Sequence, residues 1–479
     1  MEQTITHMRT LLLATPFILA TPAVAQKANI WYFGYEAGID FNSGTAVPLL
    51  NGEMISFEGC SSICDDNGEL LFYTNGGPVI PSIYDFGAVW NASHDVMPNG
   101  DLVSAGGCNS STQGSLIVQD PGNDDQYYLF TVDCLENQFA GGLRYSKVNM
   151  TLNSGLGDVT TTGMPLLTGV REALLGIRHS NGTDVWVVVH GGINNDSYYS
   201  FLVTASGIAG PNTTVIGPGS NFSGGQMSTN LLGTKVHHAA GSSSSLFDFD
   251  PATGVLSNIT NLQSTSSVIG CAFAPGGRYL YVCELHWAGD VFQYDLLATD
   301  ISASEQSIAQ VLAVQGGMQL APDGKIYIAV GGRDYLGVIN NPDSAGISAN
   351  HQLQGLYLGG RESRYSLPNF VNDLLAPSTV GINDAFPRTN DSGSGDNLGI
   401  YPNPANERVH IVCGTGLFGE RGVIEVFDAT GKRVHAEQVA SLGALQQLDV
   451  LSTWNEGLYL VMLRVEGQEP RSARVVVRR

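Results

Sequence analysis

The sequence has few charged residues, and basic residues are the scarcest of them. Charged side chains make up 14% of its 479 residues, and 22 Lys and Arg stand against 44 Asp and Glu, for a formal net charge of −22. Such a surface repels phosphate backbones and anionic lipid, which excludes nucleic acid as a partner. The low charge and the 59 glycines favour strands and tight turns over long amphipathic helices.

No run of apolar residues is long enough to span a bilayer fully as a helix. The longest near the N-terminus is "LLLATPFILA", residues 11–20, which is too short to span a bilayer. It follows Arg9 and precedes small residues at Ala23 and Ala25, the pattern of a secretory signal peptide. We therefore predict that residues 1–25 are removed between Ala25 and Gln26, leaving an exported protein with no integral membrane segment.

Catalytic and cofactor motifs are missing as well. There is no Gly-x-Ser-x-Gly elbow, no His-Glu-x-x-His pair and no phosphate-binding loop. His237 and His238 are adjacent, and neighbouring side chains on a strand point to opposite faces, so the two cannot ligate one ion there. The sequence thus predicts neither a cofactor nor a metal ion, and it assigns no catalytic residue.

Cysteine is present in an odd number. Seven cysteines in an exported chain suggest disulfides and leave at least one thiol without an intrachain partner. Cys271 and Cys283 flank the turn "APGGR" almost symmetrically, which predicts a cross-strand disulfide. Cys108 and Cys134 flank one strand pair and form the second predicted disulfide.

A strand–turn–strand phrase recurs along the chain. "CAFAPGGRYLYVCEL" at 271–285 and "MQLAPDGKIYIAVGG" at 318–332 both have this form. Similar turns occur at six positions spaced 44 to 58 residues apart: Gly68, Asp124, Gly182, Gly233, Gly277 and Gly324. Three or four residues later stands an aromatic residue or a histidine: Phe72, Tyr128, Trp186, His237, Tyr281 and Tyr327.

Repeats of about fifty residues with three or four strands each predict an all-β chain that folds as a β-propeller over residues 26–375. We predict seven blades. One of them joins a strand within "SRYSLPNFV", residues 363–371, to a strand pair at 29–41, which would close the ring and remove exposed edges. The aromatic column is interpreted as packing between adjacent blades.

The composition changes after residue 375. Residues 376–397 are rich in Ser, Gly, Asp and Asn and are predicted to be a linker. Residues 398–479 alternate apolar and polar residues between turns, which predicts a small immunoglobulin-like β-sandwich.

This C-terminal segment resembles a sorting domain. Tyr401-Pro402-Asn403-Pro404 and Gly457-Leu458-Tyr459 have the order and the distance from the terminus of the type A C-terminal sorting domain of the type IX secretion system of Bacteroidetes. The resemblance implies recognition by the type IX machinery, outer-membrane translocation, cleavage in the linker, and attachment to the cell surface or release. The body, residues 29–371, resembles a group of exported propeller proteins that carry such C-terminal tails. This second resemblance supports the predicted fold and location and implies no activity.

In a propeller, loops from several blades gather at one end of the central channel. That end is predicted to collect a set of acids, bases and an indole: Glu58, Arg171, Glu172, His190, His286, Trp287 and Arg333. Such a set at a channel mouth fits a site for a glycan or another extracellular ligand.

Three functions are compatible with a propeller that has polar residues at its channel mouth. The leading interpretation is a non-enzymatic surface or secreted propeller that binds a glycan, a surface protein, or a matrix or envelope component. The alternative is an extracellular polymer hydrolase or lyase, because propellers can build active sites from scattered residues. A purely structural role is the third, and it predicts a channel plugged by apolar side chains.

Overall fold

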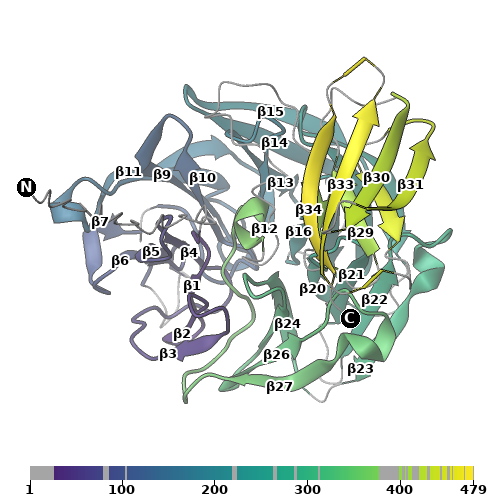
Figure 1. The fold of residues 1–479 in the computed structure, drawn as a ribbon. Coiled ribbons are helices and arrows are strands. Elements are labelled where there is room, and N and C mark those ends of the chain that lie inside the picture. The colour runs from purple at the N-terminus through teal and green to yellow at the C-terminus, as the bar shows by residue number, and fades with distance from the viewer. Residues whose placement is uncertain are drawn as a thin grey trace, which may run out of the picture.

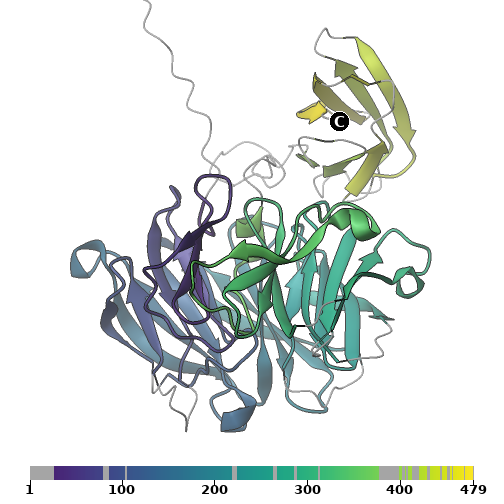
Figure 2. The same ribbon diagram turned by 90° about the horizontal axis from the view of Figure 1, so that it is seen from below.

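Short antiparallel strands joined by tight turns account for nearly all of the regular structure, as the Gly- and Asn-rich composition favours. The computed structural model describes residues 26–78, 86–102, 105–217, 224–262, 267–284, 289–310 and 313–376. In the C-terminal part it describes residues 399–401, 405, 408–412, 420–428, 432–442, 445–449, 454–455, 457–465, 467–468 and 470–477. The first part forms seven sheets arranged around an axis (Figure 1), with strands that run between the two ends of the ring (Figure 2). The predicted β-propeller with seven blades is therefore confirmed.

We number the blades in chain order. Blade 1 contains β1 (Ile30–Phe33), β2 (Ala37–Asp40) and β3 (Val47–Leu49). Blade 2 contains β4 (Ser61–Cys64), β5 (Leu70–Thr74), β6 (Ala88–Asn91) and β7 (Val96–Asp101). Blade 3 contains β8 (Ser115–Asp120), β9 (Asn123–Val132), β10 (Leu143–Asn149) and β11 (Asp158–Leu167). Blade 4 contains β12 (Val170–Arg178), β13 (Val185–Gly191), β14 (Ser197–Thr204) and β15 (Gly207–Val215).

The last three blades follow the same order. Blade 5 contains β16 (Met227–Thr229), β17 (Lys235–Ala240), β18 (Ser243–Asp250) and β19 (Val255–Leu262). Blade 6 contains β20 (Val268–Phe273), β21 (Tyr279–Glu284), β22 (Asp290–Asp295) and β23 (Gln306–Gln310). Blade 7 contains β24 (Gln315–Leu320), β25 (Ile326–Val330), β26 (Tyr335–Ile339) and β27 (His351–Tyr357).

Helices are confined to five short 3-10 segments in the described residues: η1 (Leu135–Asn137), η2 (Asn153–Gly155), η3 (Ser302–Ser304), η4 (Gly346–Ala349) and η5 (Asn372–Leu375). None of the described helices has the length and apolar composition needed to cross a membrane. In blades 2 to 7 the first strand lies innermost, beside the first strands of the neighbouring blades (Figure 1). We call the end of the ring at which these inner strands begin the mouth.

The recurrent hairpin joins the first strand of a blade to its second. In blade 7, Leu320 of β24 pairs with Ile326 of β25 across the Pro-Asp-Gly turn. Gly324 has φ of +79°, a left-handed conformation that glycine adopts without strain. The Asp323 carboxylate accepts a hydrogen bond from the backbone N–H of Lys325 at 3.2 Å. The turn residues read from the sequence thus set the register of the repeat.

The aromatic column packs between blades, as interpreted from the sequence. All six of its side chains are buried: Phe72, Tyr128, Trp186, His237, Tyr281 and Tyr327. The Trp186 indole of blade 4 donates to the carbonyl of Pro251 in blade 5 at 2.9 Å. The Tyr327 ring of blade 7 lies 5.9 Å from the Trp31 ring of blade 1. The repeat is therefore explained by inter-blade packing, which needs no ligand.

Ring closure differs from the sequence expectation. Residues 361–376, which we call the axial segment, form a single backbone bridge with blade 1, between Glu362 and Tyr35, and contact it otherwise through side chains such as Phe370, whose ring lies 5.9 Å from that of Trp31. The prediction of a strand at 363–371 is wrong, because the chain leaves the sheet edge there and blade 1 has three strands. Pro368 has no N–H to donate to a ladder, and apolar side chains on this segment are better buried along the axis.

The axial segment fills the space between the inner strands. The side chains of Leu367, Phe370, Val371 and Leu375 are each at most 7% exposed. The Asn369 amide donates to the carbonyls of Ser115 at 3.1 Å and Leu174 at 3.0 Å, which belong to blades 3 and 4.

Asn372 makes a second clamp farther along the axis. Its amide donates to the carbonyl of Leu231 in blade 5 at 2.9 Å, and its carbonyl accepts from the N–H of Arg178 in blade 4 at 2.8 Å. Together, the two asparagines link the axial segment to three blades, and apolar side chains plug the channel.

One predicted disulfide forms and the other does not. Cys108 and Cys134 are bonded, with their Cα atoms 5.6 Å apart. Cys271 and Cys283 are buried free thiols. Cys271 pairs with Val282 whereas Cys283 pairs with Gly270, so the two side chains point to opposite faces of blade 6. The two cysteines flank the turn almost symmetrically, but their positions in the strand pairing differ by one residue. This offset prevents a disulfide between them.

The C-terminal part forms a β-sandwich of two antiparallel sheets. One sheet contains β28 (Gly399–Tyr401), β29 (Arg408–Val412) and β32 (Leu445–Asp449). The other contains β30 (Gly422–Asp428), β31 (Arg433–Val439), β33 (Gly457–Val465) and β34 (Arg471–Val477). Alternate residues of facing strands, such as Val409, Val426 and Val461, are fully buried and form its core.

Candidate functional site

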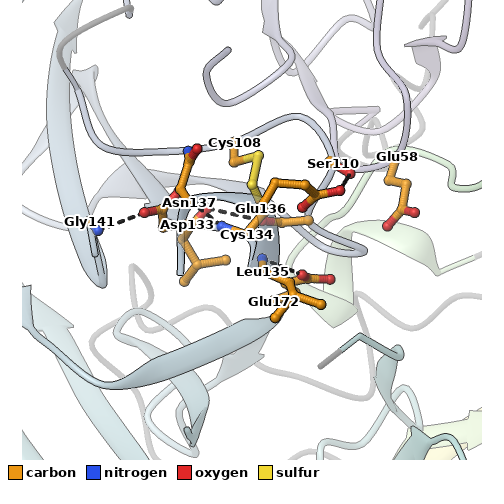
Figure 3. The surroundings of a disulfide bond; sticks show 12 residues. Glu58, Cys108, Ser110, Asp133, Cys134, Leu135, Glu136, Asn137, Gly141 and Glu172 are labelled. Carbon is orange, nitrogen blue, oxygen red and sulfur yellow. Dashed lines mark hydrogen bonds between the residues drawn. A yellow bond between two sulfur atoms is a disulfide. The ribbon is translucent and has the colours of Figure 1, made fainter. Parts of the chain in front are cut away.

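The mouth contains two of the predicted site residues close together. Glu58 precedes the inner strand of blade 2, and Glu172 lies near the start of the inner strand of blade 4. Figure 3 shows Glu172 and Glu58 in the surroundings of the Cys108–Cys134 disulfide, with Ser110 and the Glu136 carboxyl group drawn between the disulfide and Glu58. A third carboxylate, that of Glu136, lies beside them on η1.

Glu172 is a buried carboxyl that holds a loop. Its side chain is 5% exposed, and Oε1 accepts a hydrogen bond from the backbone N–H of Leu135 at 2.9 Å. Burial, with a smaller contribution from the charge of Glu136, raises the pKa of Glu172 to about 7. Near neutral pH this group therefore alternates between a carboxylic acid and a carboxylate.

Glu58 is held in a similar environment. Its Oε2 accepts a hydrogen bond from the hydroxyl of Thr112 at 3.1 Å. Burial, followed by repulsion from the charges of Glu172 and Glu136, raises its pKa well above the ordinary range. A protonated Glu58 can donate a hydrogen bond to a carbonyl or a hydroxyl, which a carboxylate cannot do.

Arg171 and His190 were predicted from the sequence to lie at the mouth. Their side chains are buried and pack within and between the blades. Arg171 is 1% exposed, and its Nε donates to the carbonyl of Gly191 at 3.0 Å. The His190 ring lies 4.4 Å from the Tyr198 ring. Burial and the nearby Arg171 guanidinium lower the pKa of His190 to about 3, so this imidazole stays neutral.

The two adjacent histidines of β17 have separate partners, as the alternation of strand side chains predicts. His237 Nε2 lies 2.9 Å from the Ser244 hydroxyl, whereas His238 Nδ1 lies 2.9 Å from the Tyr198 hydroxyl. Each also has one ring nitrogen with no hydrogen-bond partner, Nδ1 in His237 and Nε2 in His238. They fill the interior on either side of blade 5.

The remaining predicted residues do not extend this cluster. Arg333 is exposed between β25 and β26, where its backbone bridges Ser363 of the axial segment. His286 and Trp287 lie outside the described residues.

Sequence reasoning missed the loop between β9 and β10, which carries Glu136. Asp133 organises this loop by accepting hydrogen bonds from the N–H groups of Cys134 and Gly141 and from the amide of Asn137 (Figure 3). The Cys108–Cys134 disulfide ties the start of the loop to the chain that precedes β8. The cysteine pair was the signal that could have drawn attention to it.

The sorting and processing residues are described only in part. Tyr401 ends β28, Gly457-Leu458-Tyr459 begin β33, and the Tyr459 ring stacks on Trp454 at 5.1 Å. Pro402, Asn403 and Pro404 lie outside the described residues, as does Ala25. Gln26 is the first described residue, and its carbonyl accepts from the N–H of Asn29 at 3.1 Å.

Comparison with known proteins identifies the C-terminal domain. Residues 399–478 match the family described as secretion system C-terminal sorting domain. This domain implies interaction with the type IX secretion machinery, export, and a location on the cell surface or in the medium. No curated protein matches the chain.

Solved structures resemble the propeller at low identity. A candidate 6-phosphogluconolactonase from Bacteroides fragilis is 12% identical, with a TM-score of 0.45, over 71% of this chain and 97% of that one. A protein from Lactobacillus plantarum is also 12% identical, with a TM-score of 0.43, over 71% of this chain and 99% of that one. At this level of similarity no activity is transferred to the present chain.

The raised pKa of Glu172 makes a prediction about stability. A carboxyl whose pKa is near 7 in the fold and about 4.3 in the unfolded chain stabilises the fold in its protonated form, and this contribution is lost as pH rises through 7. We expect Glu172→Gln, which mimics the protonated acid, to gain about 3 kcal/mol relative to the wild type between pH 4 and pH 8. Urea unfolding at several pH values measures this difference.

The exposed carboxylate of Glu53 offers a control, since Glu53→Gln makes the same change in net charge. A difference between wild type and Glu172→Gln that does not vary with pH would show that Glu172 titrates alike in the folded and unfolded states.

Proposed function

We propose that this chain is a type IX cargo whose propeller is a binding module for an extracellular partner and performs no chemistry in its channel. The observation that argues against chemistry in the channel is its filling by apolar side chains. A purely structural role predicts the same filling, and the binding screen described below separates that role from binding. The axial segment occupies the place where a channel active site would lie, with Leu367, Phe370 and Val371 buried. Binding is then left to the loops and outer surfaces of a rigid body, which is a common use of repeat folds.

The polar groups at the mouth support the same conclusion. Arg171 donates to main-chain carbonyls of its own blade, and Glu172 accepts from the N–H of Leu135. These groups position protein segments, whereas a general acid or base must reach the proton that it transfers on a bound substrate.

One observation favours the alternative, a polymer hydrolase or lyase. Glu58 and Glu172 both have raised pKa values, and a carboxyl that stays protonated near neutral pH can serve as a general acid. In that case the two carboxyl groups would act on a chain lying across the mouth, outside the plugged channel.

A screen on polysaccharides separates these functions. The purified full-length protein is applied to an array of glycans and polysaccharides, and each bound polymer is then assayed for new chain ends. We expect saturable binding without cleavage. Cleavage that is lost in Glu172→Gln and Glu58→Gln would contradict the proposal and establish the enzyme. No binding to any polymer would favour a protein ligand or the purely structural role.

A further inference from the structure

A groove lies between blades 3 and 4, which are neighbours in the ring (Figure 1). Its volume is about 380 Å³, within the range of sites that hold small ligands. One wall is a face of blade 3, and the other is the turn between β14 and β15, residues 205–208. This turn lies at the end of the ring opposite the mouth, because β14 runs in the same direction as the inner strand of its blade.

An aromatic ring and two aliphatic side chains form the apolar part of the groove. Tyr145 of β10 is half-buried, and its ring lies 5.7 Å from the Tyr128 ring and 6.3 Å from the Phe130 ring. These buried neighbours fix the orientation of the Tyr145 ring while part of it stays accessible. Leu166 of blade 3 and Ile208 of blade 4 line the groove as well.

A hydrogen-bond donor and an acceptor stand on the same wall. Lys147 is two residues from Tyr145 on β10, so both side chains point to one face of the blade. Its ammonium group lies 4.3 Å from the centre of the Tyr128 ring and 3.7 Å from Oδ2 of Asp120. A hydrogen bond joins atoms about 2.7–3.2 Å apart, so Lys147 and Asp120 do not saturate each other. Two neighbouring hydroxyl groups can accept from the one and donate to the other.

The polar pair favours a neutral ligand. The charges of Lys147 and Asp120 cancel, so an ion bound between them would leave one charge without a partner where water has been displaced. A purely aliphatic ligand would leave both groups without hydrogen bonds. A sugar ring has a C–H face that packs on an aromatic ring and a rim of hydroxyl groups, which matches the Tyr145 ring beside this pair.

The space near Asp120 extends towards the axis of the ring. Asp120 also lines a second cavity, of about 210 Å³, which Lys27 and Gln119 border with polar groups and Val371 and Leu374 of the axial segment border with apolar ones. A polymer held in the groove therefore has a second place to contact the protein close by. This favours a stretch of a polysaccharide over a free monosaccharide.

We propose that the groove between blades 3 and 4 binds a sugar residue of a neutral polysaccharide, with the Tyr145 ring as the stacking surface, Lys147 as the donor and Asp120 as the acceptor. The inference rests on the proposed binding function and names its ligand class and its site. Both walls belong to packed blades, so the site is formed before the ligand arrives and little conformational entropy is lost on binding.

The test measures binding of soluble polysaccharides to the full-length protein by isothermal titration calorimetry. The probes are four neutral polymers, dextran, laminarin, mannan and arabinoxylan, with the polyanion alginate for comparison. We expect the wild type to bind at least one neutral polymer and not alginate. Tyr145→Ala/Lys147→Met should weaken that binding about tenfold, the loss typical of removing an anchor of a binding site.

A matched control makes the same two changes elsewhere in the ring. Tyr335 of β26 is half-buried, as Tyr145 is, and Lys235 of β17 forms an ion pair with Asp248. Tyr335→Ala/Lys235→Met thus removes one tyrosine and one paired lysine, and we expect it to bind the polymer like the wild type. Equal weakening by the two double variants would overturn the proposal.

Ser206→Leu tests the groove without removing a contact residue. Ser206 is exposed in the turn that forms the second wall, so the substitution narrows the groove at a position where the fold tolerates change. We expect it to weaken binding about tenfold as well. Wild-type affinity in a folded Tyr145→Ala/Lys147→Met would contradict the proposal, and if that variant does not fold, wild-type affinity in Ser206→Leu would do so.

The outcomes distinguish failure of this inference from failure of the proposed function. Binding of a neutral polysaccharide that the groove variants retain would leave the binding function intact and remove the groove from it. Binding of alginate alone, or of no polysaccharide, would overturn the inference and leave the function to be sought with protein ligands. Cleavage of a bound polymer would overturn the proposed function, and the groove variants would still report whether the sugar is held there.

Discussion

Replacing Asn372 by alanine should lower the free energy of unfolding of the propeller by about 3 kcal/mol. The side chain donates to the carbonyl of Leu231 and accepts from the N–H of Arg178, and it is 4% exposed. Truncation leaves these buried main-chain groups without a partner, and each such group costs about 1–3 kcal/mol. Denaturation followed by tryptophan fluorescence measures the change, because Trp31, Trp90 and Trp186 are buried in the blades.

Asn341→Ala is the comparison for this experiment. Asn341 donates one side-chain hydrogen bond, to the carbonyl of Ser348 at 3.3 Å, in an exposed turn. Its loss should cost less than about 1 kcal/mol. Equal effects of the two substitutions would mean that the axial segment does not secure the ring.

A second large effect is expected from the buried histidine of blade 5. Burial lowers the pKa of His237 to about 3, whereas an unfolded histidine titrates near 6.5. The unfolded chain therefore binds the proton first as pH falls, so stability is full above about 6.5 and is lost toward pH 3. This one group should cost the wild type about 1.4 kcal/mol for each pH unit below 6.5, or about 4 kcal/mol at pH 3.5.

The double variant His237→Leu/Ser244→Ala removes the titrating group together with its hydrogen-bond partner, which lies 2.9 Å away. Removing both members of a buried pair is close to neutral for stability, whereas removing one leaves the other unsatisfied. We expect the double variant to lose stability less steeply in acid than the wild type, and Ser244→Ala alone to keep the wild-type slope. Unfolding curves between pH 4 and pH 7 provide the slopes.

The effect expected for Asn372 follows from how the ring is closed. Each blade buries its faces against its neighbours, so the first and last blades need a connection that adjacent repeats do not provide. Here the axial segment makes that connection, because Glu362 bridges Tyr35 in blade 1 and Ser363 bridges Arg333 in blade 7. The described part of the ring ends at residue 376, and the sorting domain occupies residues 399–478.

The sequence was informative wherever the evidence was local and repeated. The turn at Gly324 and the aromatic residue that follows it mark a hairpin, and six such units predicted the ring before any contact was known. It was less informative about which residues face each other across a pair of strands. The Cys271–Cys283 prediction failed because a shift of one residue in register places the two thiols on opposite faces of the sheet.

For the candidate site, too, the sequence indicated where residues lie but not what their side chains contact. Glu58 and Glu172 both lie at the mouth, the first before an inner strand and the second near the start of one. Arg171 and His190 occupy comparable positions, yet their side chains turn into the packing between blades. Position in a repeat indicates the end of the ring at which a residue lies, but the direction of its side chain depends on the neighbouring blade.

By itself, the sequence determined the all-β class, the propeller repeat, the seven blades and the sorting tail, because turn chemistry, strand alternation and local motifs act within a few residues. Only the tertiary structure decided that the axial segment fills the channel, that Cys108 and not Cys271 forms a disulfide, and that Arg171 and His190 are buried. These features depend on contacts between residues far apart in the chain, which form only when burial, register and ring closure are satisfied together.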